Sequence, residues 1–147
     1  YAAPIKLEVD WSAKKIKDVI EDIKSNVNID ENRIYLTGLS MGGRGTFIVA
    51  SELPDYFAAI MPLSPHHQPY SYVPLAESIS HIPIWMSHGN IDYVSSYGLA
   101  LEMFNALTSF GANVIFRTEY EIGHWGWEDI YSDSLVMNWL LSIEKAQ

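Results

Sequence analysis

Four short apolar runs, each separated from the next by enough residues for a helix, constrain the fold of this chain most. They lie at 34–37, 58–63, 83–86 and 114–120. The strand predicted from the third run ends at the His88-Gly89 pair. Short runs rich in β-branched and aromatic residues and bounded by turn residues are typical of buried strands. Parallel strands need crossovers of about a dozen residues or more, so this alternation predicts an α/β fold with a parallel sheet covered on both faces.

Amphipathic patterns around these runs predict the covering helices. Apolar residues between positions 16 and 27 repeat at helical spacing after Ser12, a residue suited to capping a helix N-terminus. Further helices are expected over 42–52, as a short one over 74–80, from Ser95 or Ser96 to a stop at Gly111, and over 135–143.

Length and composition fit one globular domain covering residues 1–147. The 147 residues are 48% hydrophobic and 18% charged, which excludes a disordered chain and a coiled coil. No apolar run approaches the roughly 20 residues of a membrane-spanning helix. The net charge of -9 repels phosphate backbones and anionic lipids, so we expect neither nucleic acid nor a membrane surface as a partner.

Residue types also limit the chemistry. The chain contains no cysteine, which excludes a disulfide framework, a thiolate zinc site and a cysteine nucleophile. His66 and His67 are adjacent but have no carboxylate at ligand spacing, so we expect a solvated loop and no metal site. The chain begins at Tyr1 and carries no recognisable targeting segment, which leaves the compartment open.

The most specific motif is the sequence Gly-Leu-Ser-Met-Gly at residues 38–42. It matches the pattern G-x-S-x-G at the junction of a predicted strand and a predicted helix. Such a turn lifts the serine hydroxyl clear of the sheet, and its glycines let the backbone turn tightly. The Met41 N–H would lie at the helix N-terminus, where it can stabilise an oxyanion. We therefore predict Ser40 as a nucleophile; a glycine-rich turn that merely contains a serine is the alternative.

A serine nucleophile needs a base, and the base needs a carboxylate that orients it. His124 follows the last predicted strand, so its loop opens at the same edge of a parallel sheet as Ser40. Asp92 follows the third strand at that edge, whereas Asp55 precedes its strand and lies at the wrong edge. We predict Asp92 as the acid and His124 as the base, with Glu121 as the only credible substitute for the acid.

Each of these residues also has a structural interpretation. Asp92 could cap a helix, and His124 could be a loop histidine beside an aromatic cluster. Their order along the chain, their position at one edge of the sheet and their residue types together favour catalysis. His88 is expected to pack at the end of its strand. Trp125 and Trp127 could line the acyl or alcohol pocket, but packing against the last helix explains them at least as well.

The residues around the motif resemble a known family. The stretch 32–43, Asn-Arg-Ile-Tyr-Leu-Thr-Gly-Leu-Ser-Met-Gly-Gly, is similar to the α/β-hydrolase carboxylesterases of the phospholipase/carboxylesterase and predicted-peptidase-like group. That group is close to bacterial feruloyl and polyester esterases. The similarity continues through 56–60, 88–92 and 123–124, and covers nearly all of residues 12–145.

This resemblance implies a three-layer α/β/α-hydrolase fold with a mostly parallel sheet. It also implies cofactor-free hydrolysis of a small or aromatic carboxylic ester through an acyl-enzyme, with Ser40, Asp92 and His124 as the matching triad. A serine peptidase of the prolyl-oligopeptidase type shares the G-x-S-x-G turn and is the nearest alternative. A non-catalytic interaction module derived from a hydrolase is another.

The resemblance also points to what this chain lacks. Members of the family carry several strands and an oxyanion loop before the segment that begins here at Trp11. Residues 4–10 alternate apolar and charged side chains and could supply one covering strand. We therefore expect the chain to lack the N-terminal strands and to be the C-terminal part of a larger catalytic domain. A companion N-terminal fragment or a second copy would then cover the exposed sheet edge.

Overall fold

The computed structural model describes residues 10–145. The strand predicted over 4–10 lies outside the described residues, apart from Asp10. The elements follow in this order along the chain: α1 (Ala13–Asn26), β1 (Tyr35–Leu39), α2 (Met41–Glu52), β2 (Ala59–Leu63), the 3-10 helix η2 (Val73–Leu75), α3 (Ala76–Ile79), β3 (Ile84–Gly89), α4 (Tyr97–Ser109), β4 (Val114–Glu119), α5 (Trp127–Ser132) and α6 (Ser134–Ser142).

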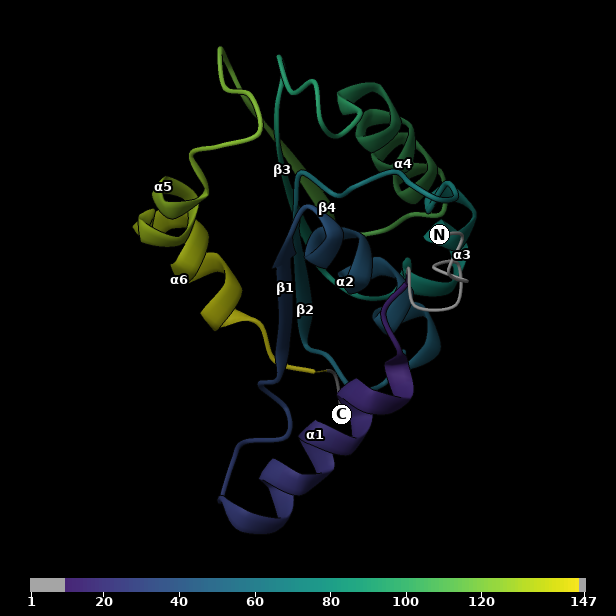
Figure 1. Cartoon of the computed structure of the whole chain (residues 1–147). Helices are drawn as coiled ribbons and strands as arrows, with labels where there is room; N and C mark the ends of the chain where they lie inside the picture. The colour runs from purple at the N-terminus through teal and green to yellow at the C-terminus, as the bar shows by residue number, and fades with distance from the viewer. Residues whose placement is uncertain (1–9, 146–147) are drawn as a thin grey trace, which may run out of the picture.

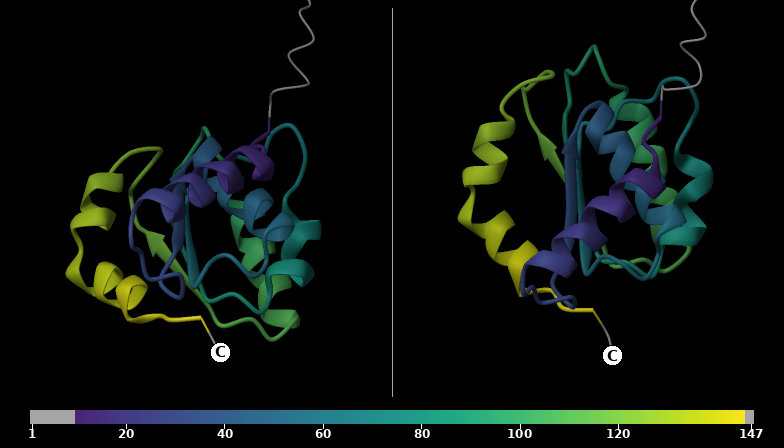
Figure 2. Two further views of the ribbon diagram at one scale, coloured as in Figure 1. Left: turned by 90° about the horizontal axis from the view of Figure 1, so that it is seen from below. Right: turned by 60° about the horizontal axis from the view of Figure 1, so that its bottom comes forward.

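The strands of the described residues form one parallel sheet in the order β1-β2-β3-β4. Each strand lies on the same side of its predecessor, and crossovers between parallel strands are right-handed. The crossover helices α2, α3 and α4 therefore share one face of the sheet, together with α1 (Figure 1). The chain after β4 crosses to the other face, where α5 and α6 pack (Figure 2). The predicted three-layer α/β/α arrangement is confirmed.

A separate apolar core fills each face of the sheet. Alternation along the strands divides the side chains: in β2, Ile60 points to the α2 face, whereas Met61 and Leu63 point to the α6 face. Phe47 of α2 is fully buried in the first core, and Val136 of α6 is fully buried in the second. None of the helices in residues 10–145 is both long and apolar enough to cross a membrane.

Two boundaries differ from those predicted. Strand β1 continues through Gly38 to Leu39, because these residues stay in register with Pro62 and Leu63 of β2. Residues 127–132, for which no helix was predicted, form α5, whose Trp127 and Ile130 are buried against the sheet. Burial of these two side chains, three residues apart, supplies the stabilisation that so short a helix lacks by itself.

Candidate active site

Ser40 lies in a sharp turn between β1 and α2. Its backbone has φ 57° and ψ -112°, a conformation that non-glycine residues rarely adopt. The Ser40 N–H donates to the carbonyl oxygen of Leu63 at 2.9 Å, which ties the turn to the end of β2. A Cβ on Gly38 would lie 2.9 Å from Gly42 Cα, so Gly38 must lack a side chain, whereas Gly42 itself has open space. The tight turn therefore depends on the first glycine of the motif.

Met41 is the first residue of α2, so its N–H has no acceptor within the helix. Among the described residues it donates no hydrogen bond to any other group either. The residue is 54% exposed. A free amide at a helix N-terminus next to Ser40 is suited to donate a hydrogen bond to a substrate oxygen on which negative charge develops.

Asp92 and His124 are in direct contact. His124 Nδ1 lies 2.7 Å from Asp92 Oδ2. The side chain of Asp92 is 0% exposed and that of His124 is 20% exposed. Because a carboxylate only accepts hydrogen bonds, Nδ1 carries a proton and donates a hydrogen bond to Asp92. The other ring nitrogen of His124, Nε2, is then free to accept a proton.

The second carboxylate oxygen of Asp92 is held by the backbone that follows it. The N–H groups of Val94 and Ser95 donate to Oδ1 at 2.8 Å and 2.9 Å. Burial raises the pKa of Asp92, but the hydrogen bonds from His124, Ser95 and Val94 outweigh burial, so the pKa lies below its ordinary value. Asp92 is therefore ionised at neutral pH and fixed in orientation.

The loops that carry Asp92 and His124 follow β3 and β4 and lie at the same end of the molecule (Figure 1). Hydrogen bonds join the two loops directly. The Ile91 N–H donates to the carbonyl oxygen of Ile122 at 3.2 Å. The Glu121 N–H donates to Asn90 Oδ1 at 2.7 Å. These contacts hold His124 against Asp92.

His66 connects this pair to Ser40. Its backbone N–H donates to the carbonyl oxygen of Ser40 at 2.9 Å. Its ring Nδ1 lies 3.5 Å from Oγ of Ser95, whose N–H binds Asp92. Burial lowers the pKa of the His66 ring, and the His67 and His124 rings lower it further. The Ser40 hydroxyl makes no hydrogen bond to His124 within residues 10–145.

The remaining candidate residues occupy different positions. Glu121 is exposed, and His124 takes Asp92 as its carboxylate partner. His66 and His67 lie in a loop, as predicted, but both are half-buried and contact Ser95 and Ser96.

Trp125 and His88 differ in exposure. Trp127 is buried in one cluster with Val136 and Leu140 of α6, as the packing alternative has it, whereas Trp125 is 58% exposed and its ring covers Gly123. His88 is fully buried at the end of β3, as predicted, but it also contacts Asp92. The four-residue spacing of the two was the one signal of that contact in the sequence.

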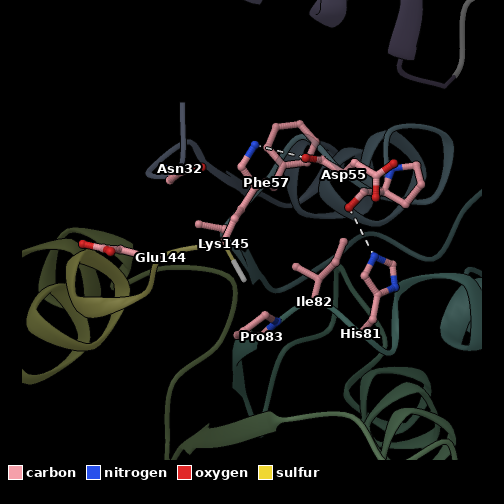
Figure 3. Close-up of a pocket in the computed structure, with 10 residues that line it drawn as sticks. Asn32, Asp55, Phe57, His81, Ile82, Pro83, Glu144 and Lys145 are labelled. Atoms are coloured by element: carbon pink, nitrogen blue, oxygen red, sulfur yellow. Dashed lines mark hydrogen bonds between the residues drawn. The ribbon is translucent and has the colours of Figure 1, made fainter. Parts of the chain in front are cut away.

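A pocket of about 420 Å³ lies at the opposite edge of the sheet, before the strands begin. Figure 3 shows Lys145 and His81 reaching into it. Lys145 Nζ donates to the carbonyl oxygen of Asp55 at 3.1 Å. His81 Nε2 lies 3.2 Å from the carbonyl oxygen of Pro54. Asp55 is therefore at the edge away from Ser40, as predicted, and the pocket is separate from the candidate site.

The part of the chain that the structure describes holds no group of three or more His, Asp or Glu side chains arranged for a metal ion. The parallel sheet with helices on both faces, the serine in a strained strand-to-helix turn, and the acid and histidine on later loops define the α/β-hydrolase class. Residues 5–134 match the model of the phospholipase/carboxylesterase family, and the chain belongs to this family.

Solved structures agree on the fold. A thermostable esterase is similar with a TM-score of 0.82 and 30% sequence identity, over 90% of this chain and 36% of that one. Esterase PE8 has a TM-score of 0.67 at 16% identity, over 88% of this chain and 62% of the other. The acylaminoacyl peptidase of Pyrococcus horikoshii has a TM-score of 0.66 at 16% identity, over 76% and 23%. The last two likenesses show the fold alone.

Two curated relatives match shorter stretches. Poly(3-hydroxyalkanoate) depolymerase C of Paucimonas lemoignei is 40% identical over 52 residues, 35% of this chain and 13% of that protein. The bifunctional acetylxylan esterase/xylanase of Neocallimastix patriciarum is 32% identical over 93 residues, 59% of this chain and 13% of that protein. The matched part is thus about an eighth of the length of each relative.

Proposed function

We propose that this chain is a serine-dependent carboxylic ester hydrolase that acts through an acyl-enzyme. The observation that carries the proposal is the 2.7 Å contact between His124 Nδ1 and Asp92 Oδ2 at the sheet edge where Ser40 stands in its strained turn. Membership of the phospholipase/carboxylesterase family and the 30% identity to a thermostable esterase support it.

In the proposed mechanism, His124 Nε2 removes the proton of the Ser40 hydroxyl while the oxygen attacks the ester carbonyl. The Met41 N–H binds the resulting oxyanion. His124 then gives its proton to the leaving alcohol, and the acyl-enzyme forms. Water, deprotonated by the same nitrogen, then attacks the acyl carbonyl. His124 returns that proton to Ser40 Oγ as the bond to the acyl group breaks and the acid leaves. Asp92 keeps the proton of His124 on Nδ1 and stabilises the imidazolium throughout.

The substrate we propose is a small or aromatic ester without strong negative charge, because the net charge of -9 repels anions. We further propose that the exposed ring of Trp125, one residue after His124, borders the acyl or alcohol group. Trp125→Ala should then raise KM for a p-nitrophenyl ester about fivefold and leave kcat within about twofold, since one aromatic contact is worth on the order of 1 kcal/mol. An unchanged KM would remove Trp125 from the substrate site.

The test of the proposed function is hydrolysis of p-nitrophenyl acetate and butyrate by the chain, with Ser40→Ala and Asp92→Asn as variants. We expect a burst of p-nitrophenol followed by steady turnover. Ser40→Ala should abolish the burst, and Asp92→Asn should lower kcat on the order of 10⁴-fold, because the asparagine holds the wrong tautomer of His124. Equal rates for all three proteins would favour a non-catalytic module.

The same assay with peptide amides distinguishes the peptidase alternative. This alternative shares the G-x-S-x-G turn, and the chain is similar in fold to an acylaminoacyl peptidase. We expect peptide p-nitroanilides to be cleaved much more slowly than the matching esters. Comparable rates would favour a peptidase of the prolyl-oligopeptidase type.

We also propose that a companion segment covers β1, which is an edge strand in the described part of the chain. The companion is an N-terminal fragment or a second copy. Intact-mass and sedimentation measurements on one sample test this: a species above 16.6 kDa is expected. A monomer of 16.6 kDa without a companion would contradict it.

A further inference from the structure

The methionines of the chain differ sharply in exposure. All five lie within the residues that the structure describes. Met41 is 54% exposed and directly follows Ser40. Met137 of α6 is half-buried. The other three are fully buried in the two cores: Met61, Met86 and Met103. The most accessible thioether therefore lies at the candidate active site.

Solvent reaches the Met41 side chain from the N-terminal end of α2. The Cα–Cβ bonds of a helix tilt toward its N-terminus, so this side chain leaves α2 toward the end that carries the free Met41 N–H. The next residue, Gly42, has no side chain, and a Cβ placed there would meet no atom within 4 Å. A small oxidant can therefore approach the sulfur atom.

The sulfur of Met41 has a specific chemistry toward peroxides. Because the chain contains no cysteine, its thioethers are the side chains that peroxide oxidises most readily. Hydrogen peroxide transfers one oxygen atom to Sδ: the O–O bond breaks, a sulfur–oxygen bond forms, and water is released. The sulfur is oxidised by two electrons and the peroxide is reduced. The product, methionine sulfoxide, is polar where the thioether was apolar.

A sulfoxide on Met41 would lie beside the proposed oxyanion site. Its oxygen carries partial negative charge and accepts hydrogen bonds. It therefore competes with a substrate oxygen for the free N–H groups at the N-terminus of α2. It also repels the negative charge that develops on the substrate oxygen. Both effects reduce the stabilisation of the transition state.

We propose that Met41 is an oxidation site at which peroxide switches the proposed hydrolase off. The loss of activity rests on the proposed function, whereas the selectivity for Met41 rests on its exposure. The switch is reversible: two thiols of a methionine sulfoxide reductase supply two electrons and two protons, and the oxygen leaves as water. The thiols become a disulfide, and the thioether is restored.

The test is treatment of the full chain with millimolar hydrogen peroxide, removal of the peroxide with catalase, and peptide mass spectrometry. We expect Met41 to gain one oxygen at least about tenfold faster than the three fully buried methionines, which react only after the core opens. Circular dichroism should show that the oxidised chain is still folded.

The same samples are assayed with p-nitrophenyl acetate. Complete conversion of Met41 to the sulfoxide should lower kcat about 10- to 100-fold and leave KM within about twofold, because competition for an oxyanion donor costs less than its removal. Methionine sulfoxide reductases for both epimers should restore the original mass and the original rate.

Met41→Leu is the matched variant, because leucine has a similar size and no sulfur. Its rate is compared with the same protein before treatment, and peroxide should not lower it. Met137→Leu removes the half-buried methionine on the other face of the sheet. This control should lose activity under peroxide as the parent does.

Two results would overturn the inference: another methionine that is oxidised before Met41, or an unchanged kcat when Met41 is fully converted to the sulfoxide. Loss of activity in peroxide-treated Met41→Leu would also contradict it. A chain that hydrolyses no ester before treatment would contradict the proposed function, and the switch would fall with it. The peptide masses would still show whether Met41 is the selective oxidation site.

Discussion

The carbonyl oxygen of Gly123 lies 2.5 Å from the position that a Cβ on Gly89 would occupy. Gly89 ends β3, and Gly123 directly precedes His124. The absence of a side chain at Gly89 therefore lets the loop that carries His124 approach the loop that carries Asp92. Real Cβ atoms do not come so close to a backbone oxygen, so any larger residue must displace one of the loops.

Gly89→Ala is predicted to separate His124 from Asp92. We expect kcat for ester hydrolysis to fall at least tenfold and the free energy of unfolding to fall by about 1–3 kcal/mol, as overpacking typically costs. Gly98→Ala in α4 is the control, because its Cβ would meet no atom nearer than 3.8 Å. Alanine favours a helix, so this control should keep its activity and its stability. Full activity in Gly89→Ala would contradict the loop-approach argument.

The Asp92 carboxylate should also make stability depend on pH. Its pKa in the folded chain lies below the ordinary value of 3.8, because hydrogen bonds from His124, Ser95 and Val94 outweigh the opposing effect of burial. The stabilisation is therefore complete above about pH 5 and is lost as the pH falls through the folded-state pKa. Urea unfolding between pH 6 and pH 3 should show a steeper loss for the parent than for Asp92→Asn. Equal slopes would mean that Asp92 contributes nothing to acid sensitivity.

Arg44 should contribute strongly to stability, because its buried guanidinium binds a carboxylate and a backbone carbonyl oxygen. Its Nε lies 2.5 Å from Asp10 Oδ1, and its Nη1 donates to the carbonyl oxygen of Tyr70. Arg44→Met leaves both acceptors without their partner and should cost about 2–4 kcal/mol of unfolding free energy. Lys14→Gln breaks an ion pair whose side chains are 82% and 60% exposed, and should cost less than about 0.5 kcal/mol. Equal melting temperatures for the two variants would contradict this difference.

Much of the site follows from strand order alone. In a parallel sheet all carboxyl ends meet at one edge, so residues that follow different strands can be placed together without knowing any contact. This reasoning paired Asp92 with His124 and placed Asp55 at the far edge, where the structure has them. The three layers follow from the same alternation of strands and helices.

Tertiary contacts decide what sequence patterns did not predict. Gly38 was interpreted as the end of β1, but pairing with Pro62 keeps it in the strand. Helix α5 has little helical periodicity and is held by burial of Trp127 and Ile130. The contact of His88 with Asp92 requires the turn in which the Asp92 N–H donates to the carbonyl oxygen of Gly89 at 3.2 Å. No pattern of residue types specifies that turn.

The most direct measurement is labelling with a fluorophosphonate probe, followed by peptide mass spectrometry to locate the label. It reports an activated serine without any choice of substrate. We predict a label on Ser40 at pH 8, and no label in Ser40→Ala or His124→Ala. An unlabelled Ser40 at pH 8 in the folded parent would contradict the claim that Ser40, Asp92 and His124 form a working site.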